Sequence, residues 1–315
     1  MADFKHYTVM KYEAVDALEC KDGLIYVDCT LGGGGHSELI LKRISPNGKL
    51  ISFDIDQDAI DAASERLKDY KNLTIVKNSY TNIKQVLKDL GIEKITGGIL
   101  FDLGASYHQL TKQERGFSFS KEAPLDMRFN MDSDFSAYDV VNDYSENDLV
   151  KIFSEYGEER FSKRIAKAIV EKRKQKPIQT TTELADIIVN STPKIKSSIH
   201  PATRVFQAIR IEVNSELQNV KNTLNDVLEL LDFGAIISVI SFHSLEDRVV
   251  KQVFKYHSTR CHCDKTQMIC NCPPPATHPF FLYTASVHPC GHYRSHPFCS
   301  LICNTPCHAF VTAKF

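Results

Sequence analysis

The chain has 315 residues, of which 43% are hydrophobic, and its 38 basic and 39 acidic side chains give a net charge of −1. This composition is typical of a soluble globular protein with one large core or two smaller ones. It excludes a uniformly basic nucleic-acid-binding protein, so a nucleic-acid site would have to be a local patch. No apolar run approaches the ~18 residues of a membrane helix, and the first residues lack the apolar stretch of a signal peptide. We expect a cytoplasmic protein with no membrane partner.

Strands and helices alternate in the first third of the chain. Short apolar runs rich in β-branched residues predict strands at 24–29, 49–56, 72–77 and 97–103. Helical periodicity fills the intervals between them. Strands that alternate with helices favour a parallel, doubly wound α/β sheet.

The alternation stops after residue 103. Residues 104–147 are irregular, and helical patterns follow at 147–176, 180–189 and 200–231. An almost wholly apolar run at 234–242 then predicts one more buried strand. The simplest organisation is a discontinuous α/β domain, residues 1–108 and 200–260, with an inserted helical domain at 109–199.

The C-terminal end differs in composition from the rest. Eight of the ten cysteines follow residue 260, together with many histidines and prolines and few charges. Residues 261–315 therefore form a separate Cys/His/Pro-rich tail. Its Cys-x-Cys pairs, Cys261 with Cys263 and Cys270 with Cys272, could offer four thiolates to zinc. Because this spacing is tighter than the common Cys-x2-Cys, we expect no metal.

A glycine-rich loop joins the first predicted strand to its helix. Gly32 to Gly35 precede His36 and Ser37, and the next strand ends in the acids Asp54 and Asp56. Glycines let a ligand approach the backbone at a helix N-terminus, and an acid about 20 residues later suits a ribose diol. The pattern favours a nucleoside cofactor, with a structural turn as the alternative. Since Ser37 stands where a dinucleotide site needs Gly or Ala, and no basic clamp is present, S-adenosylmethionine is favoured over NAD.

Two further candidates follow predicted strands. Asp102 ends the fourth strand, at the edge where open α/β sheets bind ligands, and could accept an N–H from adenine or from a substrate amine. A capping Asp at a turn is the alternative. Ser241 and His243 follow the last apolar strand, but a Ser–His hydrolase is disfavoured because no Gly-x-Ser-x-Gly sequence occurs. The simpler interpretation is that Ser244 caps a helix, with Asp247 three residues later.

Two basic segments suggest a polyanionic partner. Arg115 and Arg128 bound an irregular segment with aromatic residues, which could stack bases and hold phosphate or could be a loop that tucks its aromatics into the core. A predicted helix carries basic side chains at i, i+3, i+4 and i+7, namely Arg160, Lys163, Arg164 and Lys167. This basic stripe can bind a phosphate backbone, and a solvated helix face is the alternative.

Several long motifs resemble one family. TLGGGGHS, FDID, DLGAS, ERGFSF, PLDMR, YGEERFSKRIAKAI, HPATRVFQAIRIEVNSEL and ISFHSLEDR occur in this order within residues 6–255. They closely resemble the bacterial ribosomal RNA small subunit methyltransferase H family, of the MraW type. The resemblance implies a doubly wound, mostly parallel Rossmann-like methyltransferase sheet with an inserted helical domain. It also implies N4-methylation of a cytidine in the decoding region of 16S ribosomal RNA, within the small ribosomal subunit, by a monomer or homodimer that uses S-adenosylmethionine.

The family's cofactor contacts can be carried over residue by residue. They fall on Gly34, Gly35, His36, Asp54, Tyr80, Asp102 and Gln109. Position 80 is usually Phe in the family, and the loop from Ser106 to Leu110 lacks the family's proline. The charged stretch and closing strand expected after Cys272 are also missing, so we expect a tail that is poorly ordered or altered by a change of reading frame.

The implied reaction needs a group that acts on the cytidine N4 amine. Its lone pair is delocalised into the ring, so the amine must be oriented and its proton accepted. We expect Asp102 to do this, with Ser241 and His243 as weaker candidates, while the Arg115–Arg128 loop grips a splayed-out base. Related amine methyltransferases carry Asp/Asn-Pro-Pro-Tyr at this point; because Asp-Leu-Gly lacks the prolines and the aromatic, Asp102 could serve the cofactor instead. The rival functions are a catalytically impaired RNA- or nucleoside-binding protein on the same fold and an NAD-linked oxidoreductase.

Overall fold

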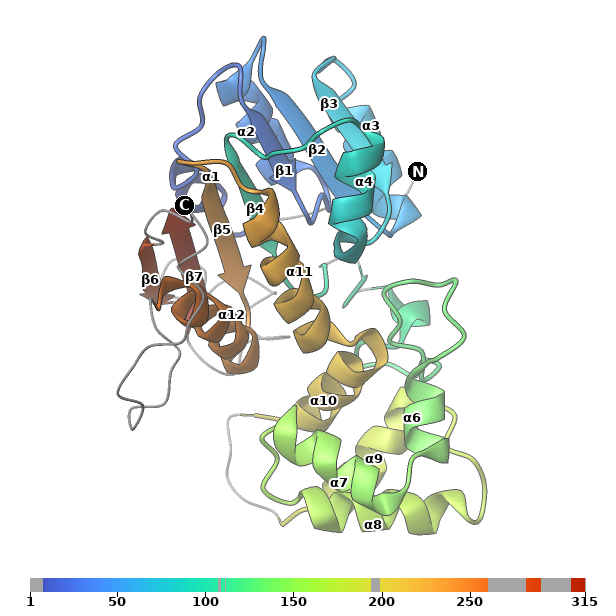
Figure 1. The fold of residues 1–315 in the computed structure, drawn as a ribbon. Coiled ribbons are helices and arrows are strands. Elements are labelled where there is room, and N and C mark those ends of the chain that lie inside the picture. Colours follow the sequence, from blue (N-terminus) through green and yellow to red (C-terminus); the bar gives the residue numbers. More distant parts are fainter. Residues whose placement is uncertain are drawn as a thin grey trace, which may run out of the picture. The chain divides into compact units, whose positions relative to one another are not determined.

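The computed structural model describes residues 8–106, 109–110, 112–193, 199–259, 282–289 and 307–314. The chain forms two compact units, one of residues 1–104 with 217–315 and one of residues 105–216. Figure 1 shows the first unit with its sheet and the second as a cluster of helices. Among the described residues, no helix has both the length and the apolarity that a membrane crossing requires.

The first unit is built on a seven-stranded sheet with the order β3-β2-β1-β4-β5-β7-β6. The strands are β1 Ile25–Asp28, β2 Lys49–Asp54, β3 Leu73–Lys77, β4 Gly98–Asp102, β5 Ile236–Ser241, β6 Leu282–Pro289 and β7 Cys307–Lys314. Strands β1 to β5 pair in parallel, whereas β7 is antiparallel to both β5 and β6. The doubly wound, mostly parallel α/β sheet is confirmed. The order reverses between β1 and β4, which makes the ends of these strands the expected place for a ligand.

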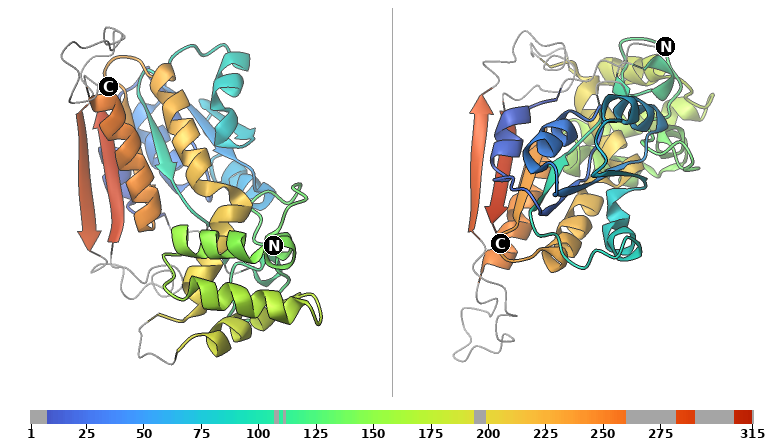
Figure 2. Two further views of the ribbon diagram at one scale, coloured as in Figure 1. Left: turned by 60° about the horizontal axis from the view of Figure 1, so that its bottom comes forward. Right: turned by 90° about the horizontal axis from the view of Figure 1, so that it is seen from above.

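Helices cover both faces of this sheet (Figures 1 and 2). They are α1 Lys11–Asp16, α2 Gly35–Ile44, α3 Gln57–Arg66, the 3₁₀ turn η1 Tyr80–Asn82, α4 Ile83–Asp89, α11 Glu216–Leu230 and α12 Ser244–Ser258. On one face Val86 of α4, Val227 of α11 and Phe254 of α12 share a buried core with Phe53, Phe101 and Val239 of the strands. On the other face, the Ser238 hydroxyl of β5 donates to the Ala14 carbonyl of α1 over 3.1 Å. Burial on both faces explains why the β5 sequence is almost wholly apolar.

Part of the C-terminal tail belongs to the sheet. The β7 ladder on β5 runs from Ile236 opposite Lys314 to Ser241 opposite Ala309, and β6 pairs along the far side of β7. Val311 and Ala313 alternate into the buried core. The expected poorly ordered tail is therefore corrected for residues 282–289 and 307–314. The four cysteines considered for zinc, at positions 261, 263, 270 and 272, lie outside the described residues.

The second unit consists of helices around its own apolar core. Its elements are η2 Gln113–Arg115, α6 Ala137–Asp143, α7 Glu146–Glu155, α8 Ser162–Arg173, α9 Thr181–Ser191 and α10 Ala202–Asn214. Phe206 and Ile209 of α10 are buried with Phe153 of α7, Ile165 of α8 and Ile188 of α9. The unit is consequently longer than the predicted insertion at 109–199, because α10 packs with it.

The single helical stretch predicted over 200–231 is in fact two helices. Ser215 lies between α10 and α11 with a φ of 49°, in the left-handed region where a helix ends. The division between the two units falls one residue later, at Glu216 and Leu217. Apolar periodicity continues across this break, so the pattern alone concealed it.

Candidate functional site

Three predicted site residues, Asp54, Asp102 and Ser241, end strands at one edge of the sheet, and Asp28 ends a fourth strand there. Asp28, Asp54, Asp102 and Ser241 are the last residues of β1, β2, β4 and β5. Since these strands are parallel, their carboxyl ends meet at the same edge. Three carboxyl groups thus gather where the fold is expected to bind a ligand.

Hydrogen bonds to Asp28 and Asp54 fix the conformation of the glycine-rich loop. Asp28 accepts the Thr30 N–H over 3.1 Å and the Ser37 hydroxyl over 2.6 Å. Asp54 accepts the Gly32 N–H over 2.8 Å and the Asp56 N–H over 2.9 Å. Each carboxyl group joins the loop to a neighbouring element, so the loop is a prearranged structure rather than a flexible connection.

Gly34 and Gly35 fit tightly into this arrangement. Gly34 precedes α2 with a φ of 74°, and a Cβ on it would lie 3.0 Å from Leu67 Cδ1 of the chain that follows α3. A Cβ on Gly35 would lie 1.8 Å from the Thr8 hydroxyl oxygen. Gly35 is therefore required by packing and Gly34 by its left-handed backbone, whatever ligand the loop binds.

Burial changes the acidity of the three carboxyl groups. Asp28 is fully buried, and desolvation raises its pKa to about 6. Burial also raises the pKa of Asp54, although the backbone N–H groups that it accepts oppose this. For Asp102, burial and then the nearby charges of Asp28 and Glu246 raise the pKa well above its usual range. The edge would bind a cation favourably, because a positive charge stabilises the ionised carboxylates.

Asp102 is the least satisfied of these groups. Its side chain is 13% exposed, and its Oδ1 atom is buried without a hydrogen-bond partner among the described residues. Its Oδ2 atom lies 3.8 Å from Nδ1 of the buried His36. The Asp102 backbone N–H donates to the Thr30 hydroxyl over 2.7 Å, so the strand end itself is fixed. A buried acceptor without a partner is what a ligand donor would complete.

His36 is oriented by the N-terminal segment. Its Nε2 lies 3.0 Å from the Val9 carbonyl oxygen. A carbonyl can only accept, so Nε2 carries a proton, and Nδ1 is the ring nitrogen that faces Asp102. Tyr80, the predicted aromatic wall, begins η1 and packs edge-on against Phe101 at 5.8 Å between ring centres.

Gln109 belongs to the second unit. It is buried, and its side-chain oxygen accepts the Ser106 N–H over 3.0 Å. The Gln109 backbone N–H donates to the Ser106 hydroxyl over 3.2 Å. These bonds join Ser106 to Gln109. Its predicted contact with a cofactor stays a prediction.

The segment after β5 caps α12. His243, not Ser244, is the N-cap, and its Nδ1 accepts the Glu246 N–H over 3.3 Å. The buried Glu246 returns a carboxylate oxygen to the Phe242 N–H over 2.7 Å. The prediction of a cap at Ser244 with Asp247 is therefore wrong by one residue: the cap is His243, with Glu246. Ser241 is 2% exposed within the sheet ladder, which gives it no access for nucleophilic chemistry.

Arg115 and Arg128 organise the loop that they bound. The Arg115 guanidinium is buried and donates to the carbonyl oxygens of Arg128 and Phe129 over 2.9 and 3.1 Å. Arg128 pairs with Asp126 over 2.7 Å. Sequence reasoning missed Asn214 at the end of α10, whose side chain accepts the Phe129 N–H and donates to the Met127 carbonyl. The continuous helical pattern over 200–231 gave no signal that singled out this asparagine.

The residues of the predicted basic stripe are exposed, unlike the buried Arg115. Arg160, Lys163, Arg164 and Lys167 are all exposed, and none makes a salt bridge within the part of the chain that the structure describes. By contrast, Lys174 and Lys176 nearby pair with Glu171 and Glu183. Lys163, Arg164 and Lys167 lie on α8, whereas Arg160 lies in the turn before it, so the predicted stripe is only partly on one helix. These exposed cations leave positive charge available to a polyanion.

Comparison with known proteins gives a consistent result. The sequence profile of the MraW methylase family matches residues 3–280. The chain is 54% identical over 269 residues to the ribosomal RNA small subunit methyltransferase H of Caldicellulosiruptor bescii, covering 85% of this chain and 87% of that protein. It is 52% identical over 271 residues to the protein of the same name from Clostridium botulinum, covering 86% and 87%. Among solved structures, an rRNA methylase from Streptococcus thermophilus covers 98% of each chain at 12% identity and a TM-score of 0.42, a similarity too distant to carry an argument.

Proposed function

This chain belongs to the MraW methylase family, and from that membership we propose that it methylates the N4 amine of a cytidine in the decoding region of 16S ribosomal RNA. The proposed methyl donor is S-adenosylmethionine, and the proposed substrate is the rRNA of the small ribosomal subunit. The observation that carries the proposal is the acidic carboxyl edge of the sheet, with the unpartnered Oδ1 of Asp102 at the end of β4.

The residues at this edge fit a cationic adenosine derivative. Asp54 uses its oxygens on two backbone N–H groups and retains lone pairs that can accept ribose hydroxyls. Asp28 and Asp102 supply negative potential, which suits a sulfonium or ammonium group. Gly34 belongs to the glycine loop, Gly35 and His36 begin α2, and Tyr80 follows β3. We propose these four residues as further contacts.

The same charges disfavour a dinucleotide. Three carboxyl groups would repel a pyrophosphate, and a nearby cation, Arg66, is already engaged by Glu38 and by the Gly33 carbonyl oxygen. The NAD-linked alternative is therefore not supported by the local electrostatics.

Asp102 is the proposed catalytic residue. S-adenosylmethionine supplies an electrophilic methyl group when bound. A carboxylate at the end of β4 can accept a hydrogen bond from the cytidine amine, which localises the nitrogen lone pair, and can then take up the proton. The raised pKa of Asp102 makes its carboxylate a stronger base than an ordinary aspartate. His243 and Ser241 are engaged in the cap and in the sheet, so we assign them to positioning the strand end.

The test is methyl transfer to immature small ribosomal subunits that lack this modification. With a labelled donor, the RNA is digested after reaction and searched for N4-methylcytidine. The parent protein is expected to produce it, and Asp102→Asn to reduce the rate by 10²-fold or more, as for loss of a general base. The control is Asp69→Asn, which changes an exposed acid away from the edge. A parent protein that binds RNA but yields no N4-methylcytidine would instead be an impaired binding protein.

A further inference from the structure

The cap of α12 uses only one of the two ring nitrogens of His243. The Nδ1 atom accepts the Glu246 N–H over 3.3 Å, so Nδ1 carries no proton. The proton of the imidazole ring is therefore on Nε2. The His243 side chain is 10% exposed, and its Nε2 atom is buried. His243 thus presents a hydrogen-bond donor on the side of the ring that the helix does not use.

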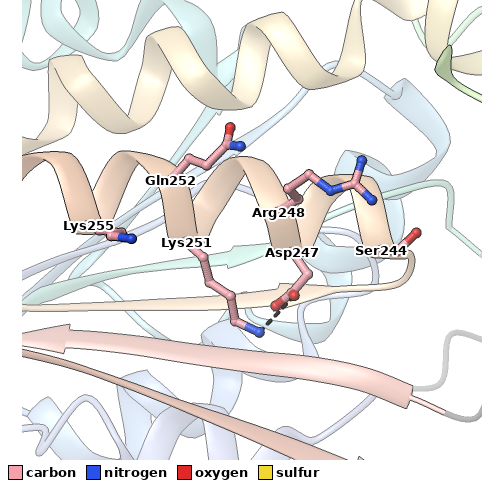
Figure 3. Close-up of a pocket in the computed structure, with 6 residues that line it drawn as sticks. All are labelled: Ser244, Asp247, Arg248, Lys251, Gln252 and Lys255. Atoms are coloured by element: carbon pink, nitrogen blue, oxygen red, sulfur yellow. Dashed lines mark hydrogen bonds and ion pairs between the residues drawn. The ribbon is translucent and has the colours of Figure 1, made fainter.

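This donor has no hydrogen-bond partner in the part of the chain that the structure describes. The Nε2 atom lies 3.2 Å from Glu246 Oε1, but the two groups are not aligned for a hydrogen bond. The other acid in the first turn of α12 is engaged elsewhere, because the Asp247 carboxylate is turned to Lys251 over 2.7 Å (Figure 3). Buried donors without an acceptor are rare in proteins, so the expected partner of Nε2 is an acceptor on a ligand.

The same edge of the sheet holds the unpartnered acceptor, Oδ1 of Asp102. Strands β4 and β5 are neighbours, and Asp102 pairs with Ile240, three residues before His243. The charge of Glu246 helps to raise the pKa of Asp102, and a Cβ on Gly104 would lie 3.9 Å from Glu246 Oε1. The carboxylate beside the His243 ring therefore also lies near the end of β4. One buried donor and one buried acceptor, both without partners, thus gather at this edge of the first unit.

A donor beside an acceptor matches the pairing edge of cytosine. Cytosine presents the N4 amine, which donates, next to the ring nitrogen N3, which accepts. Uracil presents the reverse pattern, an accepting O4 next to a donating N3–H. Proteins read an extruded base through hydrogen bonds to this edge. Uracil would leave both Oδ1 of Asp102 and Nε2 of His243 facing a group of their own kind, which disfavours its binding.

We propose that Nε2–H of His243 donates to N3 of the target cytidine while Oδ1 of Asp102 accepts its N4 amine. The proposal rests on the proposed function, because it takes the methylated base as the ligand. His243 then determines specificity for cytosine in addition to capping α12. A ring with a single proton orients the base without protonating N3, which would withdraw electrons from the amine that must attack the methyl group.

Two substitutions separate the cap from the donor. His243→Asn keeps a side-chain oxygen that can cap the helix, but it has no donor as far out as Nε2. His243→Gln extends an amide N–H to the region of Nε2 and is a poor cap. In methyl transfer to immature small ribosomal subunits, kcat/KM should fall roughly tenfold or more for His243→Asn, and His243→Gln should recover most of this loss. Stability in chemical denaturation should follow the opposite order, with His243→Asn closer to the parent.

Base recognition is measured by binding, without the methyl donor. Small subunits are reconstituted with 16S rRNA in which 3-deazacytidine, which lacks the N3 acceptor, replaces the cytidines of the decoding region. The parent protein should bind these subunits roughly tenfold more weakly than unmodified ones. His243→Asn should bind both kinds of subunit equally, because its contact with N3 is already absent. The matched control is His257→Asn, an exposed histidine near the other end of α12, which should show the same difference as the parent.

The outcomes separate this contact from the function beneath it. If the parent methylates cytidine and His243→Asn is equally active, the contact is overturned and the function stands. The contact is also overturned if His243→Asn binds the 3-deazacytidine subunits more weakly than unmodified ones. Loss of activity in His243→Gln but not in His243→Asn would show that His243 is only a helix cap. If the parent transfers no methyl group, yet the parent and His257→Asn discriminate against 3-deazacytidine and His243→Asn does not, the function fails while the contact is supported.

Discussion

Asp28 shows how a single buried group couples the proposed site to pH. Its carboxyl group lies under the glycine loop, bonded to Ser37 and Thr30, with a pKa of about 6. An unfolded chain would give it an ordinary value near 3.8. Between these values the folded protein binds more protons than the unfolded one, so stability falls as pH rises through this window. Above about pH 6 the ionised group costs the folded state up to about 3 kcal/mol.

The variant Asp28→Asn tests this cost. Asparagine cannot ionise. The free energy of unfolding of the variant, relative to that of the parent, should therefore increase as pH rises from 4.5 to 7 and then become constant. Chemical denaturation across this range measures it, with Asp69→Asn as the exposed control. The Asp28 charge also raises the pKa of Asp102, so its removal changes the titration of both groups in the same direction. Parallel curves for the parent and Asp28→Asn would contradict the assigned pKa shift.

At the level of elements, α8 and the loop from Arg115 to Arg128 use basic residues in opposite ways. In the loop, the two arginines bind backbone carbonyls and Asp126 and so define its conformation. On α8, apolar side chains such as Ile165 and Ile169 enter the core, and the basic stripe faces outward. Exposed cations contribute most of the affinity for a phosphate backbone, whereas the loop arginines are already engaged by protein acceptors. We therefore propose α8, more than the loop arginines, as the RNA contact of the second unit.

The double variant Lys163→Glu with Lys167→Glu examines the stripe. RNA affinity is expected to fall roughly tenfold or more at low salt, and the slope of log affinity against log salt to decrease by about two. Titration with small-subunit rRNA at increasing salt measures both. The control is Lys174→Glu, which changes a lysine already paired with Glu171. RNA binding equal to that of the parent would leave the stripe as a solvated helix face.

At the scale of the whole molecule, each of the two units has its own core. The two units therefore need not unfold together. The first unit depends on a contact between the far ends of the chain, because β7 pairs with β5 and contributes Val311 and Ala313 to the core. A protein shortened before β7 would leave β5 with an unpaired, apolar edge.

The variant Val311→Asp tests this dependence. A carboxylate at a position that is 1% exposed should destabilise the first unit by at least ~3 kcal/mol and leave the second unit unchanged. Hydrogen exchange resolved by segment measures both, since amides of β4 and β5 should lose protection while those of α7 and α8 keep it. Lys314→Ala, which removes a surface pair with Glu19, should cost less than ~1 kcal/mol. Unchanged protection in β5 would show that β7 is not required.

The amino-acid pattern was sufficient for everything that depends on local periodicity. The alternating strands and helices up to Asp102, the glycine loop and the apolar β5 run each follow from neighbours within about ten residues. The acids at the strand ends could be predicted as one group, because parallel strands place their carboxyl ends together. The long motifs indicated the family in the same way, as continuous strings.

Features that depend on distant contacts could not be read from the pattern. The strand β7 follows a tail of unusual composition, and it exists as an element because β5 offers an edge about 70 residues earlier in the chain. The boundary at Ser215 is invisible in a continuous helical pattern, since which core each half enters is decided by packing. Likewise, the chemistry of an arginine is the same everywhere, but burial against carbonyls at Arg115 and exposure on α8 give it different roles. Long-range pairing and burial are properties of the folded chain, because they arise between residues that the sequence keeps far apart.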